Sequence, residues 1–173
     1  MSIILKNLSL ETERTIIKDA LPSDIDFIME MENDKDNKDF VWQGTYEDHQ
    51  GEINDPDYML LVIVEKESLE RIGFFLMHYN VKSKSMEIRR IAINKKGLGY
   101  ARETLRKMID FSFKEVGANR VWLDCYTDNL RGIPLYESLA FKREGILRES
   151  YLSDSGFKDQ IIFSILKAEW TRN

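Results

Sequence analysis

The residues best suited to chemistry stand where a predicted strand, residues 86–93, gives way to a predicted helix, residues 97–116. Glycines at positions 97 and 99 let the backbone approach an anion closely, and the first N–H groups of a helix have no partner within the helix. The helix dipole adds partial positive charge at the same end. This arrangement predicts a phosphate site, to which the nearby Lys95, Lys96 and Arg102 would add full positive charges.

Three phosphate-binding patterns compete with the plainer interpretation, a tight turn into a helix. A P-loop needs Gly-Lys-Ser or Gly-Lys-Thr after four intervening residues, and the sequence does not contain it. A dinucleotide-binding loop needs Gly or Ala at position 102, where this chain has Arg102. The third pattern is a loop that binds acyl-coenzyme A. The glycine spacing alone favours the simple turn over it.

Other kinds of chemistry fail on number or spacing. His49 and His78 are far apart in the sequence and no ligand pattern accompanies them, so we expect no metal site and two ordinary surface or half-buried histidines. Cys125 stands among apolar strand residues, which favours an inert buried thiol over a nucleophile. The basic residues near the loop would suit a nucleic acid, but the chain as a whole is acidic and no stacking motif interleaves with them.

The elements that must position the loop follow from hydrophobic periodicity, β-branched runs and capping residues. We expect helices at residues 24–33, with Ser23 as N-cap, and at 45–53, 97–116 and 129–139. We expect strands at residues 14–19, with a lead-in at 3–10, and at 58–65, 71–79, 86–93, 120–126, 141–152 and 157–166. This order predicts an α/β fold in which a mixed sheet packs against helices.

Length and composition restrict the class of protein. The chain has 173 residues, of which 43% are hydrophobic and 32% charged, and this is typical of one globular domain spanning residues 1–173. Its single cysteine cannot form an internal disulfide and its opening residues do not resemble a secretory leader, so we expect a cytoplasmic protein. The longest apolar run, residues 59–64, is far shorter than the roughly 20 residues that a membrane span requires.

Charge is distributed unevenly along the chain, whose net charge is -5. Residues 24–57 hold twelve acids against Lys35 and Lys38, a balance of -10. Residues 82–107 hold nine bases against Glu87 and Glu103, a balance of +7. This segregation indicates one region for a cationic partner and another for an anionic one, whereas the plainer interpretation is two solvated faces.

Residues 87–149 resemble the Gcn5-related N-acetyltransferase (GNAT) family, specifically its branch of ribosomal-protein and spermidine acetyltransferases. The family's loop Q/R-x-x-G-x-G/A matches Asn94, Gly97 and Gly99, although Asn94 departs from the usual residue. Residues 121–145 are similar to the family's next strand and its N-x-x-A-I-x-L-Y-E-x-x-G-F helix. Residues 10–24 resemble the first strand and helix of that branch, so the resemblance covers nearly the whole chain.

The helix motif departs from the family at three positions. Gly132 replaces the usual Ala, Ala140 replaces the usual Gly before Phe141, and Pro134 replaces a polar residue. A proline inside a helix costs ~3 kcal/mol unless it lies in the first turn. We therefore expect this helix to start late, nearer Ile133.

The resemblance implies a mixed, mostly antiparallel sheet of about six or seven strands with splayed central strands, flanked by about four helices. It implies acetyl-CoA as cosubstrate and an amine as acceptor, allows a homodimer, and gives no reason to expect a metal, a nucleic acid or a membrane. Backbone N–H groups of the loop would bind the pyrophosphate, and a strand edge would pair with the pantetheine arm. The implied cofactor-binding residues are Ile91, Ala92, Ile93, Lys96, Gly97, Leu98, Gly99, Tyr100, Ala101, Arg102 and Asn129.

Two residues carry the implied catalytic roles. Tyr136 matches the family's general acid, because a phenol that is protonated at neutral pH can protonate a leaving thiolate; without the motif it would be interpreted as a core tyrosine. Glu87 matches a strand carboxylate that in some relatives relays the amine proton, and a surface charge beside Arg89 is an equally good interpretation. Asn129 would contact the pantetheine and could also cap its helix.

The predicted activity is that of an acyltransferase, with direct acetyl transfer from acetyl-CoA to a primary amine, either polyamine-like or otherwise cationic. A protein N-terminus is the alternative acceptor, and a CoA-binding or regulatory module without catalysis is the alternative of another class. Residues 33–57 are the variable segment that would decide between acceptors.

Overall fold

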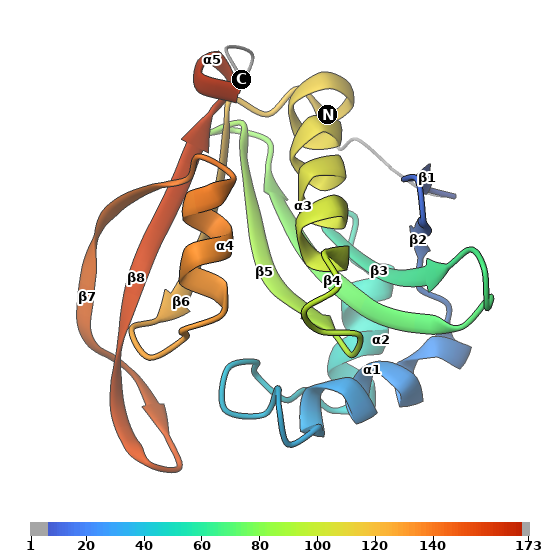
Figure 1. The fold of residues 1–173 in the computed structure, drawn as a ribbon, viewed down its shortest axis with the longest axis horizontal. Coiled ribbons are helices and arrows are strands. Elements are labelled where there is room, and N and C mark those ends of the chain that lie inside the picture. The colour runs from blue at the N-terminus through green and yellow to red at the C-terminus, as the bar shows by residue number, and fades with distance from the viewer. Residues whose placement is uncertain (1–6, 171–173) are drawn as a thin grey trace.

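One mixed sheet holds all the strands that the computed structural model describes, within residues 7–170 (Figure 1). In chain order the strands are β1 (Ser9–Glu11), β2 (Thr15–Asp19), β3 (Tyr58–Glu65), β4 (Arg71–Asn80), β5 (Ser85–Ile93), β6 (Arg120–Tyr126), β7 (Lys142–Ser153) and β8 (Gly156–Leu166). Their order across the sheet is β1-β2-β3-β4-β5-β6-β8-β7, and only β5 and β6 pair in parallel. The predicted fold class is confirmed. The described strands number eight because β1 forms its own ladder with β2; residues 3–6 of the expected lead-in lie outside the described residues.

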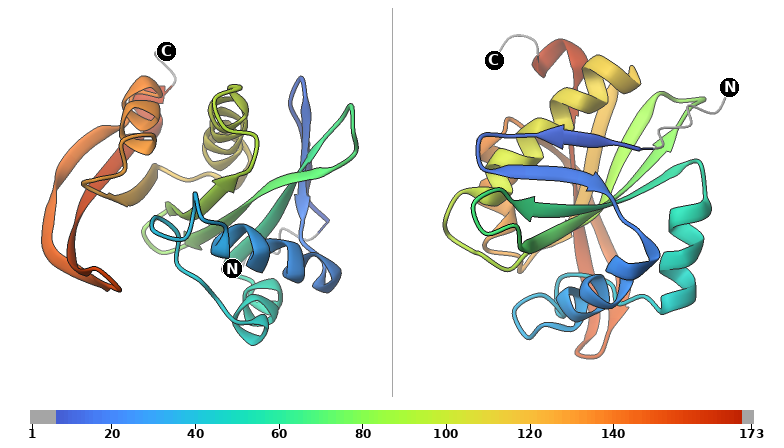
Figure 2. Two further views of the ribbon diagram at one scale, coloured as in Figure 1. Left: turned by 60° about the horizontal axis from the view of Figure 1, so that its bottom comes forward. Right: turned by 90° about the vertical axis from the view of Figure 1, so that its right-hand side faces the viewer.

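Helices cover both faces of the sheet (Figure 2). They are α1 (Ile25–Asn33), α2 (Tyr46–Asn54), α3 (Tyr100–Phe111), α4 (Gly132–Ser138) and α5 (Lys167–Trp170). The apolar face of α3 packs on one side of the sheet through Leu105, Met108 and Ile109, as its periodicity predicts. On the other side, Ile28 and Met31 of α1 pack against the sheet. The described residues contain one α-helix more than the four expected, the short α5.

Two predicted helix starts need correction. Ser23 is not an N-cap, because Pro22 opens a 3₁₀ turn at Pro22–Asp24 and α1 begins only at Ile25. The long helix begins at Tyr100 rather than Gly97, since Gly97 and Gly99 adopt left-handed conformations with φ of 75° and 84°. It continues into a π-helical turn at Ser112–Val116 and ends, as predicted, at Gly117 with φ of 81°.

The two central strands separate after a short stretch of pairing, which is the splay that the family resemblance implies. Residues Ser85–Glu87 of β5 pair with Arg120–Trp122 of β6, and beyond Glu87 the strands diverge. A β-bulge at Arg89 interrupts the pairing of β5 with β4 on the other side, where Leu76 faces Arg90 but Met77 faces Ile88. The bulge shifts the alternation by one residue, so that Glu87 and Arg90 both face the side of α1.

Helix α4 starts late, as its proline predicts. Gly132 is its first residue, and Pro134 is therefore in the first turn, where no intrahelical hydrogen bond is lost. Asn129 precedes the helix and is not its N-cap; its Oδ1 accepts a hydrogen bond from the Gly132 N–H at 2.8 Å. A Cβ at position 132 would lie 2.6 Å from Asn129 Nδ2, so an alanine here would require the Asn129 side chain to shift.

Candidate active site

A cleft of about 1300 Å³ opens where β5 and β6 diverge. It brings together twelve of the thirteen residues predicted to form the site. They are Glu87, Ile91, Ala92, Ile93, Lys96, Gly97, Gly99, Tyr100, Ala101, Arg102, Asn129 and Tyr136. The side chain of Leu98, the thirteenth, is 60% exposed and does not line the cleft.

Backbone N–H groups gather at the end of the cleft where α3 begins. The first hydrogen bond of the helical ladder runs from the Glu103 N–H to the Gly99 carbonyl, at 3.1 Å. In the described part of the chain, the N–H groups of residues 97–102 before it have no protein acceptor. Gly97 and Gly99, with positive φ, turn the chain so that this end of the helix meets the cleft.

Arg14 braces this loop from the side of β2. Its Nη1 donates to the Leu98 carbonyl at 3.0 Å, and its Nε donates to Glu103 at 2.7 Å. The guanidinium also lies 4.1 Å from the centre of the Tyr100 ring. Sequence reasoning missed this role, because no local spacing connects Arg14 with a loop more than eighty positions away.

Glu65, at the end of β3, holds the same loop from beneath. It accepts hydrogen bonds from Lys95 Nζ at 2.6 Å, from the Tyr100 hydroxyl and from Ser68. These bonds, with that of Lys95 the largest influence, lower the pKa of Glu65 to about 2. The positive charge of Lys95 is therefore paired with Glu65, whereas the sequence predicts that this charge is free to face a phosphate.

Two other cations face the cleft near the loop. Lys96 Nζ donates to Asn37 Oδ1 at 2.5 Å, which ties the loop to the segment between α1 and α2. Burial and the nearby charge of Arg131 lower the pKa of Lys96. Arg131, which precedes α4, was not predicted as a site residue. It faces the loop because α3 and α4 lie on the same side of the sheet. Arg102, by contrast, donates to Ser138 of α4.

Tyr136 is packed in the core and also reaches the cleft, so its position is compatible with either interpretation of the sequence. It is 7% exposed, and its ring packs with centroids 6.2 Å from Phe141 and 5.7 Å from Phe163. It also lines the cleft, and no described residue forms a hydrogen bond with its hydroxyl. Burial raises the pKa of Tyr136, so the phenol keeps its proton at neutral pH.

Glu87 is half-buried beside the divergence, on the face of the sheet opposite that of Tyr136. Arg89 Nη1 donates to it at 3.1 Å, and His78 Nδ1 lies 3.7 Å away. Burial raises the pKa of Glu87, and the charge of Asp124 on β6 raises it further. Asp124 also lines the cleft, and sequence reasoning missed it.

Comparison with known proteins agrees with this geometry. The sequence matches the family described as the acetyltransferase (GNAT) domain over residues 14–142. The chain belongs to the GNAT family. It is 35% identical to the N-acetyltransferase p20 of Bacillus licheniformis over 74 residues. This matched stretch covers 43% of this chain and 42% of the relative. The chain is 27% identical over 110 residues to the spermidine N(1)-acetyltransferase of Vibrio cholerae, covering 62% of this chain and 64% of the relative. The matched part thus spans less than two thirds of either relative.

Solved structures with the GNAT fold superpose over most of the chain. An acetyltransferase of the GNAT family from Bacillus anthracis gives a TM-score of 0.80 at 20% identity, covering 94% of this chain and 100% of that one. A chimera of the spermidine N-acetyltransferase SpeG of Vibrio cholerae gives 0.83 at 20% identity, covering 93% of this chain and 100% of the chimera. At this identity the likeness establishes the fold alone.

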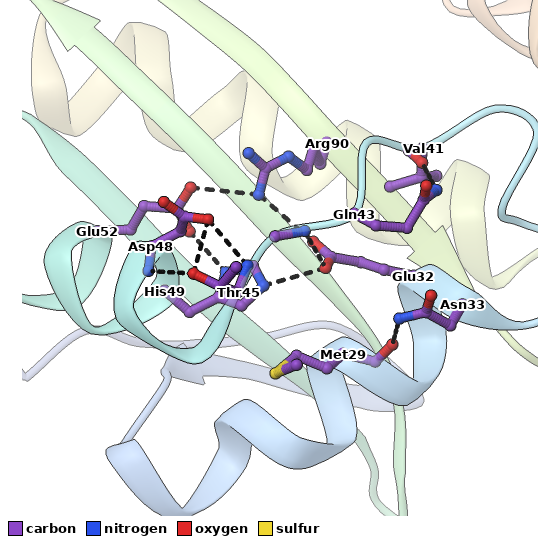
Figure 3. A network of polar contacts seen from close by, with 11 residues as sticks. Met29, Glu32, Asn33, Val41, Gln43, Thr45, Asp48, His49, Glu52 and Arg90 are labelled. Carbon is purple, nitrogen blue, oxygen red and sulfur yellow. Dashed lines mark hydrogen bonds and ion pairs between the residues drawn. The ribbon is translucent and has the colours of Figure 1, made fainter. Parts of the chain in front are cut away.

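The acidic segment of this GNAT protein is partly internal, which the charge count did not predict. Glu32 and His49 are fully buried, and His49 lies between Glu32, 3.0 Å from its Nε2, and Glu52, 2.8 Å from its Nδ1 (Figure 3). Arg90 reaches both carboxylates, at 3.4 and 3.2 Å. The guanidinium also lies 4.3 Å from the ring of Trp42, which lines the cleft. The expectation of a surface or half-buried His49 is therefore wrong, whereas His78 is half-buried as expected.

Burial alone would lower the pKa of His49, but the hydrogen bonds and charges of Glu32 and Glu52 outweigh it and raise this pKa to about 9. His49 is therefore an imidazolium near neutral pH. Cys125 behaves as predicted: it is buried and unpaired, and burial raises the pKa of its thiol to about 12. Among the residues that the structure describes, no cluster of His, Cys, Asp and Glu is suited to a metal ion, and no helix is long and apolar enough to cross a membrane.

Proposed function

We propose that this GNAT protein transfers the acetyl group of acetyl-CoA directly to a primary amine, polyamine-like or otherwise cationic. One observation carries the proposal: a single cleft joins a bare helix N-terminus at one end to Tyr136 and Glu87 at the strand divergence. The relative named as a spermidine N(1)-acetyltransferase supports a cationic acceptor.

The residues around the loop fit a pyrophosphate bound through the backbone. The N–H groups of residues 97–102 and the positive end of α3 suit an anion without any side-chain ligand. Lys96 and Arg131 add charge nearby. The part of β5 beyond Glu87 faces the divergence with an edge that β6 does not pair, so the amides of a pantetheine arm can add to it as a strand would.

The proposed reaction forms one C–N bond and breaks one C–S bond. Glu87, in its partly dehydrated position, accepts a proton from the acceptor ammonium, and the free amine attacks the thioester carbonyl. The attacking nitrogen then passes its second proton to solvent in the cleft, and collapse of the tetrahedral adduct releases the thiolate of CoA. Tyr136 gives that thiolate its proton, and solvent in the cleft restores the phenol.

A binding and turnover screen tests the proposal. Calorimetry should show acetyl-CoA binding, and a panel of alkylamines, polyamines and peptides with free N-termini should show which amine is acetylated. Faster acetylation of the peptides would favour the protein N-terminus as acceptor. CoA binding without acetylation of any amine would show instead a module without catalysis.

The catalytic assignment of Tyr136 is tested by Tyr136→Phe, which removes only the hydroxyl. We expect kcat to fall about ten- to a thousand-fold with acetyl-CoA affinity nearly unchanged, because the proton donation is made mainly in the transition state. Tyr79→Phe is a matched control, since Tyr79 is also buried, at 8% exposure, but does not line the cleft. Full kcat in Tyr136→Phe would assign Tyr136 to core packing alone.

A further inference from the structure

We propose that Asp124 of β6 is a second acceptor-binding carboxylate, which receives the ammonium group of the acceptor from the side of the cleft opposite Glu87. The inference rests on the proposed acetylation of an amine and names a residue that determines which acceptors bind. It is carried by the strand register, by the hydrogen bonds of Asp124 and by the aromatic residues around it.

The register of the central strands brings the two carboxylates to one face. Glu87 is the last residue of β5 that pairs with β6, and its partner is Trp122. Asp124 lies two residues beyond Trp122, so its side chain leaves the sheet on the same face as that of Glu87. The strands diverge at this point, and both carboxylates line the cleft between them.

Asp124 differs from Glu87 in its partners. Glu87 is paired with Arg89 at 3.1 Å, whereas Asp124 makes no ion pair with any residue that the structure describes. Its one hydrogen bond is to Oδ1, which accepts from Gln160 Nε2 at 2.8 Å. The second carboxylate oxygen of Asp124 is therefore available to a cationic ligand.

A hydrogen bond from β7 fixes the orientation of the Gln160 side chain on β8. Its Oε1 accepts a hydrogen bond from Ser150 Oγ at 2.9 Å, so its amide nitrogen points to Asp124. Ser150 is in the part of β7 where the pairing with β8 shifts between Leu147 and Tyr151, and this irregularity carries its hydroxyl to Gln160. The chain Ser150–Gln160–Asp124 thus positions the carboxylate from outside the cleft.

The surroundings of Asp124 suit an alkylammonium. Tyr126 and Tyr151, whose ring centroids are 5.3 Å apart, line the same part of the cleft and offer aromatic surface to the apolar part of such a ligand. Lys158, whose Nζ lies 4.9 Å from the Tyr126 ring, is paired with Asp128 at 3.2 Å, so its charge is compensated. Burial raises the pKa of Asp124 and of Glu87, although the charge of Arg89 lowers both; Asp124 also raises the pKa of Glu87, and an ammonium between the two would relieve that repulsion.

Asp124→Asn tests the charge alone, because an asparagine Oδ1 can still accept the hydrogen bond from Gln160. We expect the KM for the amine to rise at least ten-fold, while kcat changes less and the KM for acetyl-CoA stays within two-fold. Asp124→Glu, which restores the charge, should recover part of the loss. Asp154→Asn is the matched control, since Asp154 is exposed in the β7–β8 turn and does not line the cleft. An unchanged KM for the amine in Asp124→Asn would overturn the proposal.

A double-mutant cycle tests Gln160 as a positioning residue. Gln160→Met removes both hydrogen bonds with little change in length, and we expect it to raise the KM for the amine about three- to ten-fold. In the Asp124→Asn background the same change should have almost no further effect on this KM, because Gln160 acts through the carboxylate. Additive effects would overturn this role, since they would mean that Gln160 acts independently.

Equilibrium binding separates this inference from the proposed function. Calorimetry with the best acceptor amine in the presence of CoA needs no turnover, and the wild-type protein should bind the amine at least ten-fold more tightly than Asp124→Asn. Acetylation by the wild type with equal amine affinity in the variant would overturn this inference alone. A wild type that neither acetylates nor binds any amine would overturn the proposed function, and this inference with it.

Discussion

The two ends of the cleft are formed by different kinds of chemical group. The end assigned to the cofactor consists of backbone N–H groups and two glycines with positive φ, with Arg14 and Glu65 behind them. The end assigned to the acceptor consists of side chains, such as Glu87 and Asp124, that come from separate strands. A site made of backbone needs a few residues at fixed spacing, whereas a site made of side chains depends on how distant segments meet.

The supports of the two ends also differ. The loop is held by ion pairs in which the cation is partly exposed, such as Arg14 on Glu103 and Lys95, with 34% of its side chain exposed, on the buried Glu65. The segment between α1 and α2, which lines the cleft, is flanked by a buried set in which His49 of α2 lies between Glu32 of α1 and Glu52. Exposed pairs contribute little and are screened by salt, whereas removing one member of a buried set leaves an uncompensated charge. Breaking this buried set should therefore cost more stability than breaking a more exposed pair of the loop, such as Arg14 with Glu103.

The largest expected effect follows from His49→Gln. This change removes the positive charge between two carboxylates, one of which, Glu32, is fully buried, so the free energy of unfolding should fall by roughly 3 kcal/mol. Denaturant unfolding measures the loss. His78→Gln is the control, since His78 is half-buried and should cost much less. Equal losses in the two variants would contradict the contrast between the supports.

The same residue makes stability depend on pH. His49 has a pKa of about 9 in the folded protein and about 6.5 when unfolded, so the folded state binds more protons between these values. Its contribution is fully present below pH 6.5 and is lost as the pH rises through 9, by about 3 kcal/mol in all at ~1.4 kcal/mol per unit. Unfolding measured from pH 6 to 9.5 should show this fall in the wild type and a much smaller one in His49→Gln.

The sequence predicts the geometry of the loop and of α3 well because the signals are local. Two glycines, an amphipathic helix and the closing Gly117 fix that geometry within about twenty residues. Pro134 likewise predicts the late start of α4. Even one departure has a local explanation: Ala140 has a left-handed φ of 67°, which shows why glycine is usual at that position.

The acceptor end could not be predicted in the same way, because its contacts join residues far apart in the sequence. Arg90 meets Glu32 only because the bulge at Arg89 turns it toward α1. Asp124 gains its role from Gln160 on a strand that closes the sheet much later in the chain. The charge balance of residues 24–57 also includes Glu32 as if it were a surface charge, although the packing of the helix buries it.

The next largest effect concerns the loop itself. Gly97→Val places a β-branched residue at a φ of 75°, where it is strained even though a Cβ there would meet nothing within 4 Å. The loop should change conformation, and acetyl-CoA affinity should fall about ten- to a hundred-fold, or about 1.4 to 2.8 kcal/mol. Gly145→Val in β7, where a Cβ also has open space, is the matched control. Unchanged acetyl-CoA affinity in a folded Gly97→Val variant would remove the loop from the cofactor site.

The smallest expected effect sharpens the contrast from the acceptor side. Asp34, Asp36 and Asp39 are exposed acids of the segment between α1 and α2, and of these only Asp36 lines the cleft. They can attract a cationic amine over a distance but have no geometry to bind it, and at 0.1 M salt such attraction is screened within about 10 Å. Changing all three to Asn should therefore lower kcat/KM for a cationic amine only about two- to three-fold, with acetyl-CoA binding unaffected.

Ionic strength separates this steering from direct binding. The small advantage of the wild type over the triple variant should vanish as salt rises toward 1 M, where the screening length is about 3 Å, whereas the loss caused by Asp124→Asn should persist because that carboxylate would touch the ammonium. Kinetics at several salt concentrations, with the three proteins compared on one amine, provide the measurement. A triple variant that equals the wild type at low salt would mean that these three acids only solvate the segment. A loss of ten-fold or more that survives high salt would mean that the acceptor binds to the exposed segment itself, and that its surface acids do not differ in role from the carboxylates of the cleft.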